Sequence, residues 1–357
     1  MPRCCVSRPS VCPRYLRSFP AKRLSLRIME YRHVGRSELV TSAIGFGCIP
    51  LGGTFGPVDE ADVLGTIRQA LTVGITCFDT APVYGFGRAE ELLGQALGRW
   101  RQEVTIITRV GHVWDPANPE QTVRRDGSRA AVLDGGGGLH ASLRRLGTDY
   151  VDLLLADAPD TQTPIEETMA ALVEAREQGK ARHIGVANFK SEQLLACLRH
   201  APLIVNEVDY HLFDRRWDQE VFETCRMFGI GVLASSSLAT GLLAGALTPE
   251  TTFSETDPRH SQASNQGLFG DGNLAQNLAV VERLKKLASR HRASVAQLAL
   301  AWVLHQPAVS VALVGMAQPS EVVENVGALG IQLTPDDLTD LETAMEGTAG
   351  LTDSLPG

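Results

Sequence analysis

The stretch from residue 152 to residue 187 has the sequence DLLLADAPDTQTPIEETMAALVEAREQGKARHIGVA and contains one strand–helix–strand unit. The short apolar runs at its two ends have the length and composition of buried strands. Between them, the amphipathic segment 164–178 is a predicted helix. Thr163 is its expected N-cap, Pro164 its first residue and Gly179 its stop signal. This order of elements is typical of a parallel sheet covered by helices.

The same alternation continues along the chain from Glu30 onward. Eight strands are predicted, over residues 43–49, 76–79, 104–109, 152–156, 183–187, 204–208, 231–235 and 309–314. Helices are predicted over residues 59–73, 89–97, 129–146, 164–178, 191–200, 217–228, 277–290, 298–305 and 320–329. Eight such repeats imply a parallel sheet that closes on itself. We therefore predict one α/β domain over residues 30–357, a (β/α)8 TIM barrel.

Four consecutive glycines, Gly135 to Gly138, fall inside the helix predicted over 129–146. Glycine costs roughly 1 kcal/mol relative to alanine at each helical position, so a broken helix is expected here. A phosphate-binding loop is not expected, because no Lys-Ser/Thr pair follows the glycines.

Composition and charge exclude several classes of protein. The chain is 44% hydrophobic and 21% charged, as in a globular protein, and no run approaches the roughly 18 apolar residues of a membrane span. Residues 1–29 contain seven basic and no acidic side chains. The remainder has 26 basic and 41 acidic residues, a net charge of -15. Nucleic-acid binding is not expected of such an acidic body, because it depends on lysine and arginine at phosphates.

Residues 1–29 are interpreted as a disordered basic leader. Three origins are open: a start codon placed upstream of the true start at Met29, an unstructured tail, or a targeting segment. Seven cysteines without a CxxC pair indicate reduced thiols in a cytoplasmic protein. The nine histidines form no HExxH motif and no cluster with cysteine, so no metal site is predicted.

Charged and polar residues follow the predicted strands, where a TIM barrel has its active site. Tyr84 lies in a loop, five residues after Asp79. Any one of these residues alone is more simply a cap or a solvated rim residue, but together they predict a site. They are Asp79, Arg109, Asp157, Asn188, Glu207 and Asp209.

Residues 31–345 resemble the aldo-keto reductase family, and residues 30–32 and 50–57 resemble its aldose and sugar dehydrogenase side most closely. The matching motifs are LVTSAIGFG at 39–47, GITCFDTAPVYG at 74–85, LRRLGTDYVD at 143–152, GVAN at 185–188, GLLAG at 241–245 and EN at 324–325. The resemblance implies hydride transfer from a nicotinamide to a carbonyl or conjugated enone of a small molecule.

The resemblance also implies a catalytic tyrosine, a lysine held by an aspartate, and a histidine that orients the carbonyl. Tyr84 and Asp79 match, whereas Arg109 replaces the lysine and Asp157 the histidine. A free phenol has a pKa near ~10, so the site is expected to lower that of Tyr84. Two interpretations of Asp157 remain open. It forms an ion pair with Arg109, or it stays protonated and donates a hydrogen bond, as the glutamate of the family's steroid double-bond reductases does.

Several residues that line the cofactor cleft in the family are replaced in this chain. The resemblance implies NAD or NADP, with Ala317 and Glu321 at the 2'-phosphate site. Because neither is basic and Glu321 would repel a phosphate, NADH is favoured. The residues carried over as cofactor contacts are Asn188, Glu207 and Ser235 at the nicotinamide, Ser236 and Leu238 at the pyrophosphate, and Glu324 and Asn325 at the adenine.

Three functions are consistent with these residues. The first is a nicotinamide-dependent redox enzyme. The second is an enzyme of the same fold that uses Tyr84, Asp157, Arg109 and Glu207 for lyase, dehydratase or isomerase chemistry. The third is a non-catalytic binding protein, like the potassium-channel beta subunits of this fold. Retention of the Asp79 and Tyr84 pair argues against the third.

Overall fold

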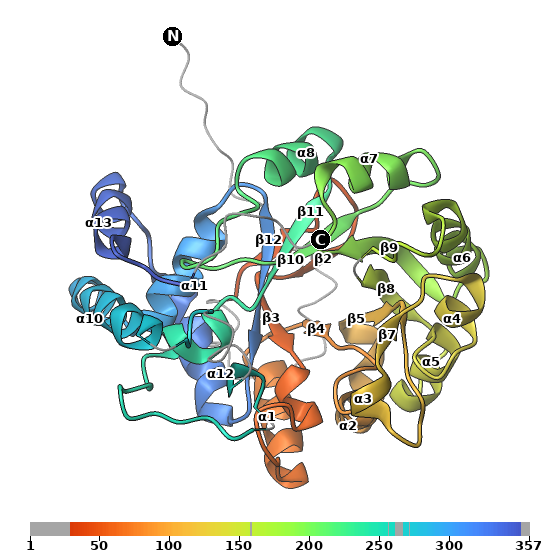
Figure 1. Ribbon diagram of the computed structural model, residues 1–357, viewed down its shortest axis with the longest axis horizontal. Helices are drawn as coiled ribbons and strands as arrows, with labels where there is room; N and C mark the ends of the chain where they lie inside the picture. The colour runs from red at the N-terminus through yellow and green to blue at the C-terminus, as the bar shows by residue number, and fades with distance from the viewer. Residues whose placement is uncertain (1–28, 158, 256, 261–266, 271, 351–357) are drawn as a thin grey trace.

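Eight parallel strands close into a barrel at the centre of the computed structural model, which describes residues 29–157, 159–255, 257–260, 267–270 and 272–350. The strand order is β10-β11-β12-β3-β4-β5-β8-β9 (Figure 1). The strands are β3 (Ile44–Gly47), β4 (Cys77–Asp79), β5 (Thr105–Val110), β8 (Val151–Asp157), β9 (Ala181–Ala187), β10 (Val205–Asp209), β11 (Gly231–Ser235) and β12 (Val309–Gly315). Each overlaps one predicted strand, so the predicted (β/α)8 barrel is confirmed.

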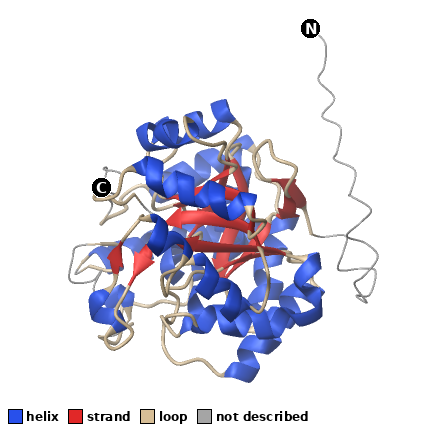
Figure 2. Ribbon diagram, turned by 90° about the vertical axis from the view of Figure 1, so that its right-hand side faces the viewer, coloured by secondary structure: helices blue, strands red, loops and turns tan. Residues whose placement is uncertain are grey.

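Helices surround the barrel in both views (Figures 1 and 2). They are α1 (Glu60–Thr72), α2 (Arg88–Leu97), α3 (Pro119–Thr122), α4 (Arg129–Leu133), α5 (Leu139–Leu146), α6 (Ile165–Glu177), α7 (Ser191–Leu198), α8 (Glu220–Phe228), α10 (Asn273–Arg290), α11 (Val295–His305), α12 (Pro319–Val326) and α13 (Pro335–Met345). Short 3-10 helices are η2 (Ile49–Gly52), η3 (Gly98–Glu103), η4 (Ala239–Ala244) and η5 (Gly327–Gly330).

Two small hairpins lie at opposite ends of the barrel (Figure 2). The first, β1 (Tyr31–His33) with β2 (Val40–Ser42), covers the N-terminal end, and its Val34 packs against Leu153, Leu233 and other residues inside the barrel. The second, β6 (His112–Val113) with β7 (Arg124–Arg125), follows the C-terminal end of β5. Because Val34 helps to close one end, the strand ends at the other are available for a site.

Some helices begin at other residues than predicted, because the expected capping side chain forms a different hydrogen bond or the first predicted residues are not helical. The first residue of α6 is Ile165, and Pro164 is its N-cap with a non-helical ψ of 134°. The expected N-cap, Thr163, instead donates its hydroxyl to Asp160 at 2.6 Å. The helix predicted over 217–228 begins only at Glu220. We did not predict α13, although Thr334 caps it as a threonine should.

The helix break predicted at the four glycines is confirmed, because α4 ends before them and α5 begins after them. A Cβ on Gly137 would lie 2.3 Å from the carbonyl oxygen of His112 and 2.6 Å from the Trp114 ring. The glycine therefore lets the chain after β5 approach closely.

The predicted leader, residues 1–29, lies outside the described residues except for Met29. Met29 is buried in the hydrophobic core, so it belongs with the barrel rather than with the leader. Across the described part of the chain, no helix has the length and apolar character needed to cross a membrane.

Candidate active site

Arg109 lies among acidic side chains at the C-terminal ends of the barrel strands. Its Nη2 atom donates to Asp79 Oδ2 at 3.0 Å and also to Glu207 Oε1. Its Nη1 atom lies 3.6 Å from Asp157 Oδ2. These four side chains come from β5, β4, β10 and β8, respectively. The structure thus brings together strand-end residues that are distant in the sequence.

Burial raises the pKa of two carboxyl groups beside Arg109. It raises the pKa of Asp79 to about 6, although the Arg109 guanidinium opposes the shift. It raises the pKa of Glu207 well above its usual range, again against the effect of Arg109. Burial by itself lowers the pKa of Arg109, but Asp79 and Glu207 raise it by more. The guanidinium thus carries its charge beside two carboxyl groups whose protonated forms are favoured by burial.

Tyr84 lies in the loop after β4, beside Arg109. The guanidinium carbon is 5.6 Å from the centre of the phenol ring, within cation–π range. The loop is packed closely against η2, because a Cβ on Gly52 would lie 2.5 Å from the nitrogen of Gly85. Burial raises the pKa of Tyr84 above its usual value, although Arg109 opposes the shift. The lowered pKa expected from the resemblance is therefore not found, because burial outweighs the effect of Arg109. The phenol carries its proton at neutral pH.

His112 lies beside the site, although it is not among the catalytic or cofactor-contacting residues predicted from the sequence. Its Nδ1 atom lies 3.7 Å from Asp157 Oδ2, the same oxygen that faces Arg109. Burial lowers the pKa of His112, and Asp157 acts in the opposite direction. The 3.6 Å separation between Asp157 Oδ2 and Arg109 Nη1 is compatible with the ion-pair interpretation. The available sequence signal was that His112 follows Arg109 by three residues at the same strand end.

The residues present at the expected nicotinamide site fit a carboxamide. Glu207 Oε2 is buried and has no hydrogen-bond partner among the residues that the structure describes. A carboxyl oxygen can accept a hydrogen bond from the N–H groups of a carboxamide. Asn188 directly follows β9 and has a φ of 62°, a conformation that is uncommon outside glycine and often marks functional sites.

Ser235 and Ser236 are oriented by a third residue. Both hydroxyls donate to Asp209 Oδ1, at 3.0 Å and 2.7 Å. Asp209 ends β10, which pairs with β11, the strand that Ser235 ends. The sequence predicted cofactor contacts for the two serines but not this shared carboxylate, which depends on strand pairing.

The turn after β11 suits a phosphate group. Ser236 and Thr240 have φ values of 52° and 53°, which are costly for residues with a Cβ and point to a functional constraint. Arg259 Nη1 lies 3.5 Å from the place that a Cβ on Gly241 would occupy. A guanidinium beside this turn fits the pyrophosphate predicted near Ser236 and Leu238.

Arg259 also connects two loops above the barrel. Its side chain pairs with Asp257 at 2.6 Å, so much of its charge is compensated. Its guanidinium carbon lies 5.2 Å from the centre of the Phe55 ring and 4.5 Å from that of Phe253. The loops that follow β3 and β11 are therefore joined through one side chain.

An acidic residue occupies the N-terminus of α12. Glu321 Oε2 accepts hydrogen bonds from the backbone nitrogens of Ala317 at 2.7 Å and Gln318 at 3.0 Å. Because a carboxylate already uses these donors, a 2'-phosphate at this helix end would meet repulsion. Glu324 and Asn325, the predicted adenine contacts, lie further along the same helix, and Asn325 is buried.

A sequence model described as the aldo/keto reductase family matches residues 43–346. The chain belongs to the aldo/keto reductase family. It is 36% identical over 324 residues to the aldo-keto reductase YhdN of Bacillus subtilis, across 90% of this chain and 95% of that protein. It is 32% identical over 319 residues to the NADH-specific methylglyoxal reductase of Escherichia coli, across 86% and 95% of the two chains.

Solved structures agree with this assignment. A glycerol dehydrogenase from Gluconobacter oxydans is similar with a TM-score of 0.79 and 31% identity, over 88% of this chain and 94% of that chain. As an aldo/keto reductase, the protein is an NAD(P)-dependent oxidoreductase. Within the described residues, no group of three His, Cys, Asp or Glu side chains is placed to hold a metal ion. The three carboxyl groups at the strand ends of this reductase surround the guanidinium of Arg109.

Proposed function

We propose that this aldo/keto reductase reduces a small, polar carbonyl compound with NADH, and that Tyr84 donates the proton. The observation that carries the proposal is the position of Tyr84 against Arg109, which Asp79 holds by a 3.0 Å hydrogen bond. This reproduces the acid, cation and carboxylate that the resemblance implies, with arginine in place of lysine.

Carbonyl reduction needs a hydride at carbon, which a bound nicotinamide would supply, and a proton at oxygen. Tyr84 donates that proton from its hydroxyl group. The negative charge left on the phenolate then forms beside the Arg109 guanidinium, which stabilises it. Burial raises the pKa of Glu207 against the effect of Arg109, so the Glu207 carboxyl group offsets less of the Arg109 charge than an exposed carboxylate would.

The surroundings of the site favour a small oxygenated substrate. Asp157 and His112 add hydrogen-bonding groups beside Arg109. Phe86 and Trp114 form an aromatic pair in the neighbouring loops, with ring centres 5.4 Å apart. Two similar proteins are a methylglyoxal reductase and a glycerol dehydrogenase. By analogy, three-carbon hydroxy or oxo carbonyl compounds are the proposed substrates.

The proposal is tested by following NADH oxidation with methylglyoxal, dihydroxyacetone and benzaldehyde as substrates. We expect carbonyl-dependent oxidation, fastest with the three-carbon compounds. Consumption of a carbonyl compound without NADH oxidation would contradict reduction and support acid–base chemistry instead. Tight NADH binding without turnover of any carbonyl would support a binding protein.

A separate prediction concerns cofactor choice. NADH should bind at least as tightly as NADPH, because Glu321 occupies the helix end where a 2'-phosphate would lie. Glu321→Gln keeps an acceptor for the backbone but removes the charge. Combined with Ala317→Arg, it should shift the ratio of affinities toward NADPH by about tenfold or more. Titration calorimetry with each dinucleotide measures this ratio.

The matched control for this experiment is Glu177→Gln, an exposed residue on α6 that should leave both affinities unchanged. Clearly tighter binding of NADPH than of NADH by the unmodified protein would contradict the assignment. So would an unchanged ratio in the double variant.

A further inference from the structure

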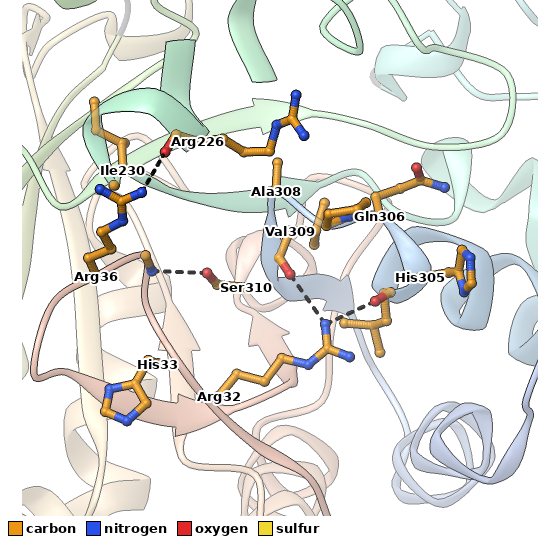
Figure 3. Close-up of a pocket in the computed structure, with 14 residues that line it drawn as sticks. Arg32, His33, Arg36, Arg226, Ile230, His305, Gln306, Ala308, Val309 and Ser310 are labelled. Atoms are coloured by element: carbon orange, nitrogen blue, oxygen red, sulfur yellow. Dashed lines mark hydrogen bonds between the residues drawn. The ribbon is translucent and has the colours of Figure 1, made fainter. Parts of the chain in front are cut away.

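A second possible binding site lies at the opposite end of the barrel from Tyr84. A cavity of about 510 Å³ is formed by the β1–β2 hairpin, the C-terminal ends of α8 and α11, and the start of β12 (Figure 3). Its volume is in the range of small-molecule sites. The polar and charged side chains that line it include Arg32, His33, Arg36, Arg226, His305 and Ser310.

The charge of this cavity is opposite to that of the protein. Its lining contains three arginines and two histidines, and no aspartate or glutamate is among its described lining residues. Residues 30–357 as a whole have 26 basic and 41 acidic side chains. A concentration of cations on an acidic protein is an electrostatic feature that attracts anions.

The arginines differ in how far their charge is compensated. Arg32 pairs with Glu30 at 2.8 Å and donates to the carbonyl oxygens of Leu304 and Val309. Arg36 makes one long hydrogen bond, 3.5 Å, to the carbonyl oxygen of Arg226. Within the described part of the chain, neither Arg36 nor Arg226 has an acidic partner. In Figure 3 all three arginines surround the start of β12.

The C-terminal ends of two helices offset part of the positive charge of the arginines, but not all of it. Arg36 and Arg32 bind carbonyl oxygens at the C-terminal ends of α8 and α11, where cations are favoured. Each helix end contributes roughly half a negative charge. Together with Glu30 they offset about two of the three guanidinium charges, so roughly one positive charge remains before the histidines are counted.

The Arg36 side chain is exposed, and the backbone restrains only its stem. Its stem lies across Gly229, since a Cβ there would be 2.7 Å from Arg36 Cδ. Gly229 has a φ of 74° and ends α8, so this close approach is built into the backbone. A side chain with a restrained stem loses less entropy when its guanidinium binds an anion.

We propose that this cavity binds a phosphate ester of a small metabolite. Guanidinium groups match phosphate oxygens through paired hydrogen bonds. The apolar part of the lining, which includes Ile230, Pro307 and Ala308, offers contact to the organic part of such a molecule. Because the site is distant from Tyr84, it is separate from the proposed reductase function.

The test is titration calorimetry of the full chain with glucose 6-phosphate and AMP, with NADH saturating so that the dinucleotide site is blocked. The variant is Arg36→Gln with Arg226→Gln. The matched control is Arg199→Gln, an exposed arginine at the end of α7. We expect the unmodified protein and the control to bind at least one phosphate ester, and the double variant to bind it about tenfold more weakly or worse.

Two further readouts separate this site from a general loss of structure. NADH affinity should be equal in all three proteins. The ligand should raise the melting temperature of the unmodified protein and the control, but not that of the double variant. Failure of the unmodified protein to bind either ester at low ionic strength would overturn the proposal. Equal affinity of the double variant for the ester would also overturn the proposal. Binding of inorganic phosphate as tightly as the esters would contradict a contact between the apolar lining and the organic part of the ligand.

Discussion

Replacing Tyr84 by phenylalanine is expected to lower kcat for carbonyl reduction by about 10²–10⁴-fold, the usual contribution of a general acid. The substitution removes one hydroxyl group and leaves the ring that packs beside Arg109. NADH affinity and melting temperature should therefore stay close to those of the parent. Steady-state kinetics, NADH titration and thermal unfolding measure the three quantities.

Tyr150→Phe is the matched control for this prediction. Tyr150 immediately precedes β8, at the opposite end of the barrel from Tyr84, and its ring stacks with Arg101 and Arg182. Loss of its hydroxyl should leave kcat unchanged. Nearly full turnover by Tyr84→Phe would show that another group supplies the proton.

Replacing Arg109 by glutamine should destabilise the protein by about 3–5 kcal/mol near neutral pH, the range for removing one partner of a buried ion pair. Arg109 is the cation that contacts Asp79, Glu207 and Asp157. Without it, those carboxyl groups that are ionised repel one another in a site where few water molecules can screen them. Free energies of unfolding from denaturant titrations measure the loss.

The loss should depend on pH in a definite direction. Burial holds the pKa of Asp79 at about 6, above its unfolded value. Ionised Asp79 therefore lowers stability as pH rises through this range, and protonation relieves the cost as pH falls. Removing Arg109 strengthens the effect, so Arg109→Gln should be more damaging at about pH 8 than at about pH 5.

Neutralising the carboxyl groups provides the control. Arg109→Gln combined with Asp79→Asn and Glu207→Gln should recover much of the lost stability, because the two carboxyl groups that bind Arg109 most closely are then uncharged and only Asp157 loses a cationic partner. A double-mutant cycle should also give stronger coupling of Arg109 to Glu207 than to Asp157, which lies 3.6 Å away. Equal losses at both pH values, or no recovery in the triple variant, would contradict this description of the site.

The strands of the barrel are readable from the sequence because each depends on local apolar runs. Residues 231–235 were predicted and observed with the same bounds. Helix ends were less accurate because they depend on single hydrogen bonds. Thr163, for example, donates to Asp160 instead of capping α6. The sequence around Thr163 does not show which of these two hydrogen bonds forms.

The strand-end location of Asp79, Arg109, Asp157 and Glu207 also follows from the sequence, once the barrel is inferred. One of the two interpretations drawn from the sequence paired Arg109 with Asp157, because both replace expected residues. In the structure, Arg109 instead binds Asp79 and Glu207 more closely. The length and direction of the Arg109 side chain across the barrel decide which carboxyl groups it contacts. The spacing of these residues along the sequence shows neither the length nor the direction.

The sequence by itself determined the barrel, the strand ends that carry the site and the match of Tyr84 and Asp79 to a reductase. Only the tertiary structure brought His112 to Asp157, placed Glu321 across the N-terminus of α12, and gathered Arg32, Arg36 and Arg226 into one basic cavity. The physical reason is the range of the interactions. Apolar periodicity acts between neighbours along the chain, whereas burial and charge depend on side chains that meet only when the barrel closes.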